Sequence, residues 1–154
     1  MSEEKIVILY VDDEENNLVS FKANFRLKYQ IHIALSGDEA LKILATKNID
    51  IVITDQRMPN MTGVEFLEIV IDKFPEPMRL LLTGYTDMTA VIDAVNKGKI
   101  FHYLTKPWNE AEMDKTIANA YAVLKERRDR IAMNEKLELA NDQLEFMLRQ
   151  KLLS

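Results

Sequence analysis

Five short apolar segments, separated by amphipathic ones, constrain the fold of this chain more than any other feature of its sequence. The apolar segments are residues 5–11, 31–35, 49–54, 78–83 and 100–105. Their near-continuous Val, Ile and Leu runs are typical of strands buried on both faces, because a half-exposed strand would alternate apolar and polar residues. We therefore predict an α/β fold in which helices cover both faces of one parallel sheet.

The intervening segments have the spacing and the end signals of helices. Leu18, Phe21 and Phe25 recur at helical intervals in the first of them. Gly98 is placed to end the fourth. The handedness of crossover connections leaves few arrangements for five such units. We predict the flavodoxin-like, doubly wound, five-stranded parallel sheet with strand order 2-1-3-4-5.

Composition argues against several classes of function. The chain has no cysteine, which removes disulfides, thiol nucleophiles and thiolate zinc sites. Its formal net charge of −5 disfavours direct binding of nucleic acid. No apolar run approaches the roughly 20 residues of a membrane span. MSEEKIVILY at the N-terminus carries acids before a short apolar run, whereas a secretory signal has basic residues before a longer apolar segment. We expect a cytoplasmic protein that does not insert into a membrane.

Residues 109–154 contain neither Gly nor Pro and differ in this from the rest of the chain. As one helix they would span roughly 70 Å, which exceeds the length that a compact domain of about 105 residues covers. We therefore predict a domain over residues 1–122 and an extended C-terminal helix over residues 123–154.

Apolar residues in the C-terminal helix have a spacing that suggests a coiled coil, with a slip in register near Met133 and Asn134. They are Leu124, Ile131, Leu137, Leu144 and Leu148. We predict that this helix forms a parallel homodimer. The alternative is a solvated single helix with a weak apolar stripe.

Polar side chains stand where four of the five predicted strands end. They are Asp12 and Asp13 after the first strand, Asp55 after the third, Thr83 at the end of the fourth and Lys106 after the fifth. Each taken singly has an ordinary use as a helix cap, a turn residue or a surface charge. Because the carboxyl ends of parallel strands meet at one edge of a sheet, we expect all five side chains to converge.

The chemistry of this set of residues indicates phosphoryl transfer. Three carboxylates so close together repel one another unless a cation lies among them. Oxygen ligands without His or Cys select a hard ion such as Mg²⁺, for which Mn²⁺ is the expected substitute. The lysine and the threonine suit an anion bound beside that ion. A carboxylate in such a site can itself be the nucleophile.

Four stretches, ILYVDDE, DIVITDQRMPNMTG, LLLTGYTD and YLTKPW, occur in this order, and with them the chain resembles the CheY-like receiver domain of two-component response regulators. The resemblance covers residues 5 to about 122. It implies a phosphoprotein that accepts a phosphoryl group from a histidine kinase or phosphotransfer protein in a magnesium-dependent reaction. It implies a signalling domain and not an enzyme, because such a domain catalyses only its own phosphorylation and dephosphorylation.

The resemblance also implies roles for the acidic residues that follow the predicted strands. Asp55 is implied as the phosphate acceptor, Asp13 as a direct magnesium ligand and Asp12 as a ligand through water. The backbone carbonyl of Arg57 is implied as a further metal ligand.

Switching is implied for a second group of residues. Thr83 is implied to turn toward the phosphate after transfer, and Tyr103 to turn inward with it as the switch aromatic. From spacing alone, Tyr103 is better interpreted as a ring at the edge of the core. Lys106 is implied to pair with the phosphate, with a cis peptide bond between Lys106 and Pro107.

Two bulky residues flank the expected phosphate. Arg57 lies two residues after the acceptor, and Tyr85 lies two residues after Thr83. We expect their side chains to shield the phosphate from water and to lengthen its lifetime. The alternative is that both point to solvent.

Three interpretations of the output remain open. The chain is a receiver whose signalling helix leads to an output domain, such as a cyclic-nucleotide enzyme or a phosphatase, or it is a complete regulator that dimerises or docks on a partner. In both cases we expect phosphorylation to act through the face of the fourth helix, fifth strand and fifth helix. The third is an aspartate-nucleophile phosphohydrolase. It is disfavoured because such enzymes carry an Asp-x-Asp motif on the first strand, which here ends in VDDEE.

Overall fold

A sheet of five parallel strands forms the centre of the protein, in the order β2-β1-β3-β4-β5. The computed structural model describes residues 4–153, apart from the side chain of Tyr85. The strands are β1 (Val7–Val11), β2 (Gln30–Ala34), β3 (Ile51–Asp55), β4 (Met78–Thr83) and β5 (His102–Thr105). The predicted fold class and strand order are confirmed.

Helices connect the strands in the alternation that the sequence predicts. They are α1 (Glu15–Phe25), α2 (Gly37–Thr46), α3 (Gly63–Lys73), α4 (Met88–Asn96) and α5 (Glu110–Leu153). A short 3₁₀ helix, η1 (Tyr85–Asp87), precedes α4 and was not predicted. Gly98 follows α4 with a φ of +74°, a backbone conformation that glycine adopts without strain.

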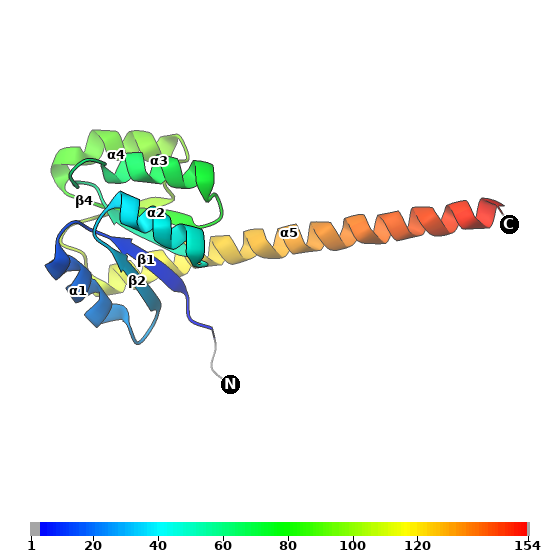
Figure 1. The fold of residues 1–154 in the computed structure, drawn as a ribbon, viewed down its shortest axis with the longest axis horizontal. Coiled ribbons are helices and arrows are strands. Elements are labelled where there is room, and N and C mark those ends of the chain that lie inside the picture. Colours follow the sequence, from blue (N-terminus) through cyan, green and yellow to red (C-terminus); the bar gives the residue numbers. More distant parts are fainter. Residues whose placement is uncertain (1–3, 154) are drawn as a thin grey trace. The chain divides into compact units, whose positions relative to one another are not determined.

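Both faces of the sheet are covered, which explains the near-continuous apolar strands. Leu9 and Val11 of β1 belong to a core cluster that they share with α2, α3 and α4. Tyr10 lies between them in sequence, and its ring stacks on Phe21 of α1. Figure 1 shows α3 and α4 on one side of the sheet and α1 on the other.

The chain divides into two compact units between Tyr121 and Ala122, and α5 runs through this division. In the first unit, the opening turns of α5 bury Met113 and Ile117. In the second unit, every described side chain over residues 129–153 is exposed. Among the described residues, no helix is both long and apolar enough to cross a membrane.

Candidate functional site

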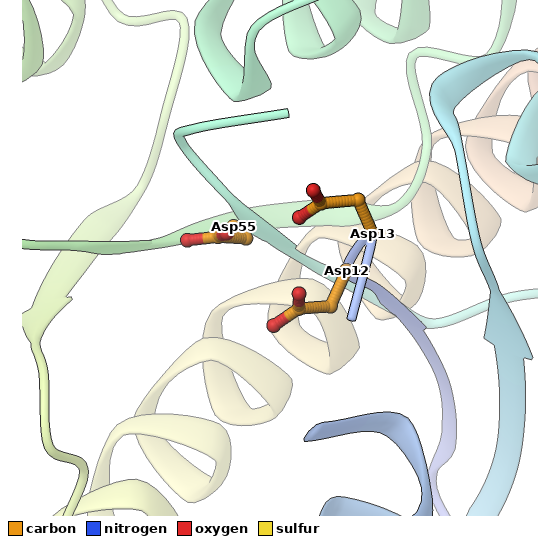
Figure 2. A group of neighbouring side chains, drawn as sticks. All are labelled: Asp12, Asp13 and Asp55. Carbon is orange, nitrogen blue, oxygen red and sulfur yellow. The ribbon is translucent and has the colours of Figure 1, made fainter. Parts of the chain in front are cut away.

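The carboxylates of Asp12, Asp13 and Asp55 form one acidic cluster at the carboxyl ends of β1 and β3. The ladder places them there, because Val11 pairs with Thr54, one residue before Asp12 and Asp55. One carboxylate oxygen of each residue lies within 4.8 Å of the others. Figure 2 shows the three side chains grouped together. Asp12 and Asp55 are buried, and Asp13 is exposed.

The carboxylate of Asp55 is buried, and its contacts with Lys106 and Gln56 only partly offset the cost of burying its negative charge. Its Oδ1 atom lies 2.6 Å from Nζ of Lys106 and accepts a hydrogen bond of 3.0 Å from the backbone N–H of Gln56. Burial raises the pKa of Asp55, the Lys106 ammonium opposes this, and the charge of Asp12 adds to the increase. The balance leaves the pKa of Asp55 above its ordinary value, so the site favours additional positive charge.

Hydrogen bonds join the segment that follows Asp55 to the start of α3. The side-chain oxygen of Gln56 accepts a hydrogen bond of 2.9 Å from the N–H of Val64, and its backbone carbonyl accepts one of 2.9 Å from the N–H of Gly63. Thr62 and Glu65 complete a capping box at the same helix end. The position of Asp55 therefore depends on the N-terminus of α3 as well as on the sheet.

Thr83 and Lys106 come from the neighbouring strands, as the sequence predicts for their positions. Thr83 is buried at the end of β4, and its hydroxyl donates to the carbonyl of Gly84 over 3.1 Å. The backbone N–H of Lys106 donates to the carbonyl of Thr83 over 3.0 Å. The peptide bond between Lys106 and Pro107 is cis.

A small pocket of about 190 Å³ opens beside Asp55. It is lined by Asp55, Gln56, Arg57, Gly84, Thr86, Asp87 and Lys106. The pocket thus combines two carboxylates, a guanidinium and an ammonium with the short loop that follows β4. It offers room for a small anion beside Asp55.

The side chain of Arg57 reaches across this pocket to η1. Its Nε atom lies 2.9 Å from Asp87 Oδ2, and its Nη2 atom donates to the hydroxyl of Thr86 over 3.0 Å. The side chain is 72% exposed, and these two contacts hold it against η1. The side chain of Tyr85, for which we predicted a similar shielding role, lies outside the described residues.

Tyr103 is half-buried on β5 and packs against the core cluster that α2, α3 and α4 share with the sheet. Its ring centroid lies 5.6 Å from that of His102. The structure therefore places Tyr103 at the edge of the core. Its role in switching stays a prediction.

Three residues at the site were not predicted from the sequence. Tyr10 and Asn17 both donate to Asp12 Oδ2, each over 3.1 Å. Gln56 links the segment after Asp55 to α3. The adjacency of Gln56 to Asp55 was the one sequence signal available, because the contacts of Tyr10 and Asn17 depend on the packing of α1.

Residues 8–118 match the family model of the response regulator receiver domain. The chain is 34% identical over 120 residues to the hydrogenase transcriptional regulatory protein HoxA of Cupriavidus necator. That alignment covers 78% of this chain and 25% of HoxA. The chain thus spans about a quarter of the length of the curated relatives it matches first.

Solved structures show the same similarity. An adenylate cyclase from Rhodopirellula baltica is 28% identical, with a TM-score of 0.83 over 86% of this chain and 98% of that chain. The response regulator protein TrrA from Thermotoga maritima, solved in complex with Mg²⁺ and BeF, is 29% identical. Its TM-score is 0.67 over 75% of this chain and 98% of that chain.

Proposed function

Because the chain belongs to the response regulator receiver domain family, we propose that it is a phosphorylation-dependent switch whose phosphoryl acceptor is Asp55. The donor is the phosphohistidine of a histidine kinase or phosphotransfer protein. One observation carries the proposal: the buried carboxylate of Asp55 lies beside two further carboxylates and 2.6 Å from the Lys106 ammonium. Membership of this family argues against the alternative of an aspartate-nucleophile phosphohydrolase.

The acidic cluster fits Mg²⁺. Its donors are all carboxylate oxygens from Asp12, Asp13 and Asp55, and they lie close enough to share one ion. The backbone carbonyl of Arg57 is the further ligand that we propose, and Mn²⁺ would fit the same oxygen donors. A bound divalent ion would offset the negative charge that gathers on the phosphoryl oxygens during transfer.

The chain's own residues account for the rest of the transfer. A carboxylate oxygen of Asp55 forms a bond to phosphorus as the bond between phosphorus and the donor nitrogen breaks, and the product is an aspartyl phosphate. Oδ1 of Asp55 is already paired with Lys106. In the proposed product, the Lys106 ammonium transfers its contact to a phosphoryl oxygen. The hydroxyl of Thr83 leaves Gly84 and donates to the phosphate, and Tyr103 turns inward into the space that Thr83 leaves.

Phosphorylation itself is the direct test of this proposal. We expect the chain to gain the mass of one phosphoryl group when it is incubated with Mg²⁺ and acetyl phosphate, as measured by intact-mass spectrometry. Mn²⁺ in place of Mg²⁺ should support the reaction, whereas a chelator should prevent it. A chain that gains no mass under either metal would overturn the proposal.

Arg57→Ala should shorten the lifetime of the phosphorylated state several-fold. A phosphoryl group in the pocket would compete with Asp87 for the guanidinium, which could then cover the phosphate. The measurement is the loss of phosphoryl mass with time after removal of the donor. Asp87→Asn is the matched variant, because it frees the guanidinium without removing it and should not shorten the lifetime. Equal decay in Arg57→Ala and the unmodified chain would rule out this role, and the same comparison applies to Tyr85→Ala.

The second part of the proposal concerns the output, for which α5 is the connecting element. The named relatives include a transcriptional regulatory protein and an adenylate cyclase, so the family serves several outputs. We infer that residues 123–154 form a parallel homodimer, which passes the switched state to an output domain or, in a complete regulator, to a docked partner. The proposed route runs from Tyr103 through α4, β5 and the start of α5.

The heptad pattern supports two parallel chains. Leu137, Leu144 and Leu148 are each more than half exposed. In a register with Leu137 and Leu144 at d, Asn134, Asn141 and Leu148 fall at a. Asn at a favours a dimer with both chains in one register, because each Asn then meets its own copy.

Leu144→Lys should weaken this dimer about 100-fold or more. Two buried leucines would be lost from one layer, at about 1.5–3 kcal/mol each. Light scattering gives the absolute mass. Leu139→Lys is the control. Leu139 is 60% exposed but lies outside the a and d positions, so the Leu139→Lys protein should remain a dimer. Leu144→Lys at the mass of the unmodified dimer would contradict the pairing.

The same measurement with and without Mg²⁺ and beryllofluoride separates two modes of signalling. A dimer that forms only with this phosphate mimic, and not in Asp55→Asn, would make dimerisation the switched event. A dimer in both states would make the helix a standing scaffold whose geometry changes.

A further inference from the structure

We infer that Tyr10 is a positioning residue for the metal site, because its hydroxyl holds the carboxylate of Asp12 in the orientation that the acidic cluster needs. This inference rests on the proposed function. Tyr10 is the penultimate residue of β1 and is 1% exposed. Its hydroxyl donates to Asp12 Oδ2 over 3.1 Å.

Protein groups, and not bulk water, fix the carboxylate of Asp12. The residue is fully buried. Its Oδ2 atom accepts from the Tyr10 hydroxyl and from Nδ2 of Asn17, and its Oδ1 atom accepts from the backbone N–H of Glu14 over 3.0 Å. Loss of the phenol would leave Oδ2 with one donor while the two neighbouring carboxylates still repel it.

The phenol is suited to this role because a phenolic O–H donates a hydrogen bond and an ionised carboxylate only accepts. The hydroxyl of Tyr10 is buried with Asp12 as its hydrogen-bond acceptor.

An aromatic cluster fixes the phenol in turn. The Tyr10 ring stacks on Phe21, with centroids 4.1 Å apart and planes 5° apart. Phe21 also contacts Phe25 and forms a T-shaped pair with Trp108, at centroid distances of 4.8 and 5.9 Å. The hydroxyl thus projects from a rigid stack onto Asp12, and partners of this kind that orient metal ligands typically contribute 10–100-fold to metal affinity.

Tyr10→Phe tests this role, because it removes the hydroxyl and keeps the stacked ring. We expect the dissociation constant for Mg²⁺ to rise about tenfold. The fluorescence of Trp108 is the readout, since it is the single tryptophan and lines one pocket with Tyr10, Asn17 and Lys106. At saturating Mg²⁺, the rate of phosphorylation by acetyl phosphate should return to that of the unmodified chain.

Tyr29→Phe is the matched control. It removes a hydroxyl that donates to Asp114 over 2.7 Å, in a contact between the turn before β2 and α5. Its Mg²⁺ affinity should be unchanged. The rise in melting temperature on addition of Mg²⁺ is a second measure of affinity that serves even a destabilised variant.

Equal Mg²⁺ affinity in Tyr10→Phe and the unmodified chain would overturn the inference and leave the proposed function intact. An equal loss of affinity in Tyr10→Phe and Tyr29→Phe would also overturn it, because the effect would then be one of general stability. An unmodified chain that binds no Mg²⁺ would instead contradict the proposed function itself.

Discussion

Asp55→Asn should abolish phosphorylation and, in metal-free buffer, make the folded domain more stable at neutral pH. The first effect follows from the chemistry, because an amide cannot replace the attacking carboxylate oxygen. The second follows from the site, because Asp55 is 5% exposed and adds a third charge to a cluster within 4.8 Å. Asn keeps the shape of the side chain and removes that charge.

The stabilisation should depend on pH in a defined direction. Burial, against the opposing charge of Lys106, holds the pKa of Asp55 above its unfolded value. The cost of ionising Asp55 in the fold is therefore absent below the unfolded pKa, grows as the pH rises and is complete above the folded pKa. The melting temperature of Asp55→Asn should exceed that of the unmodified chain by a few degrees at pH 7, and the difference should vanish at low pH.

The loss of the ion pair with Lys106 does not reverse this expectation. The side chain of Lys106 is 36% exposed, so its ammonium regains water when the carboxylate is removed. Intact mass after incubation with acetyl phosphate and thermal melts in a chelator measure the two effects. Asp72→Asn, an exposed residue of α3, should be phosphorylated normally. Phosphoryl transfer to Asp55→Asn would contradict the role of Asp55 as phosphoryl acceptor. A lower melting temperature for Asp55→Asn at pH 7 would contradict the expected cost of its buried charge.

Periodicity predicted the sheet but not every strand end. The fifth apolar segment begins at Ile100, whereas β5 begins at His102. Ile100 is 3% exposed and packs in the core cluster that includes α4. Ile49 likewise is buried but precedes β3. Apolar runs report burial, and a loop residue that enters the core lengthens the run without joining the ladder.

The position of a site residue could be predicted from the sequence where the residue follows directly after a strand. It could not be predicted where a contact depends on the packing of two segments that are distant in sequence. Asp12, Asp55 and Lys106 could be grouped because parallel strands share an edge. The hydrogen bond from Tyr10 to Asp12 requires α1 to fix the ring. Arg57 pairs with Asp87, thirty positions further along the chain in η1. This 3₁₀ helix of three residues is too short to show a periodic pattern in the sequence.

Gly63→Ala should destabilise the domain by about 1–3 kcal/mol, although alanine is the better helix former. Gly63 begins α3, where helix propensity alone would favour alanine by up to about 1 kcal/mol. A Cβ atom at this position would overlap the backbone carbonyl of Asp55 and meet Leu81 at 2.7 Å and Cα of Gln56 at 3.0 Å. Two of these three neighbours are backbone atoms, which cannot rotate away, so the steric cost exceeds the gain in propensity.

Gly84→Ala is the matched control, because a Cβ atom there would meet nothing within 4 Å. Its φ of −84° suits any residue, so its stability should change by less than about 0.5 kcal/mol. Urea denaturation measures both variants. Because the added Cβ atom would press on the backbone of Asp55, the same variant should also be phosphorylated more slowly than the unmodified chain under conditions in which it is fully folded. A Gly63→Ala protein as stable as Gly84→Ala would show that α3 does not constrain the acceptor, and Asp55 would then be positioned by the sheet alone.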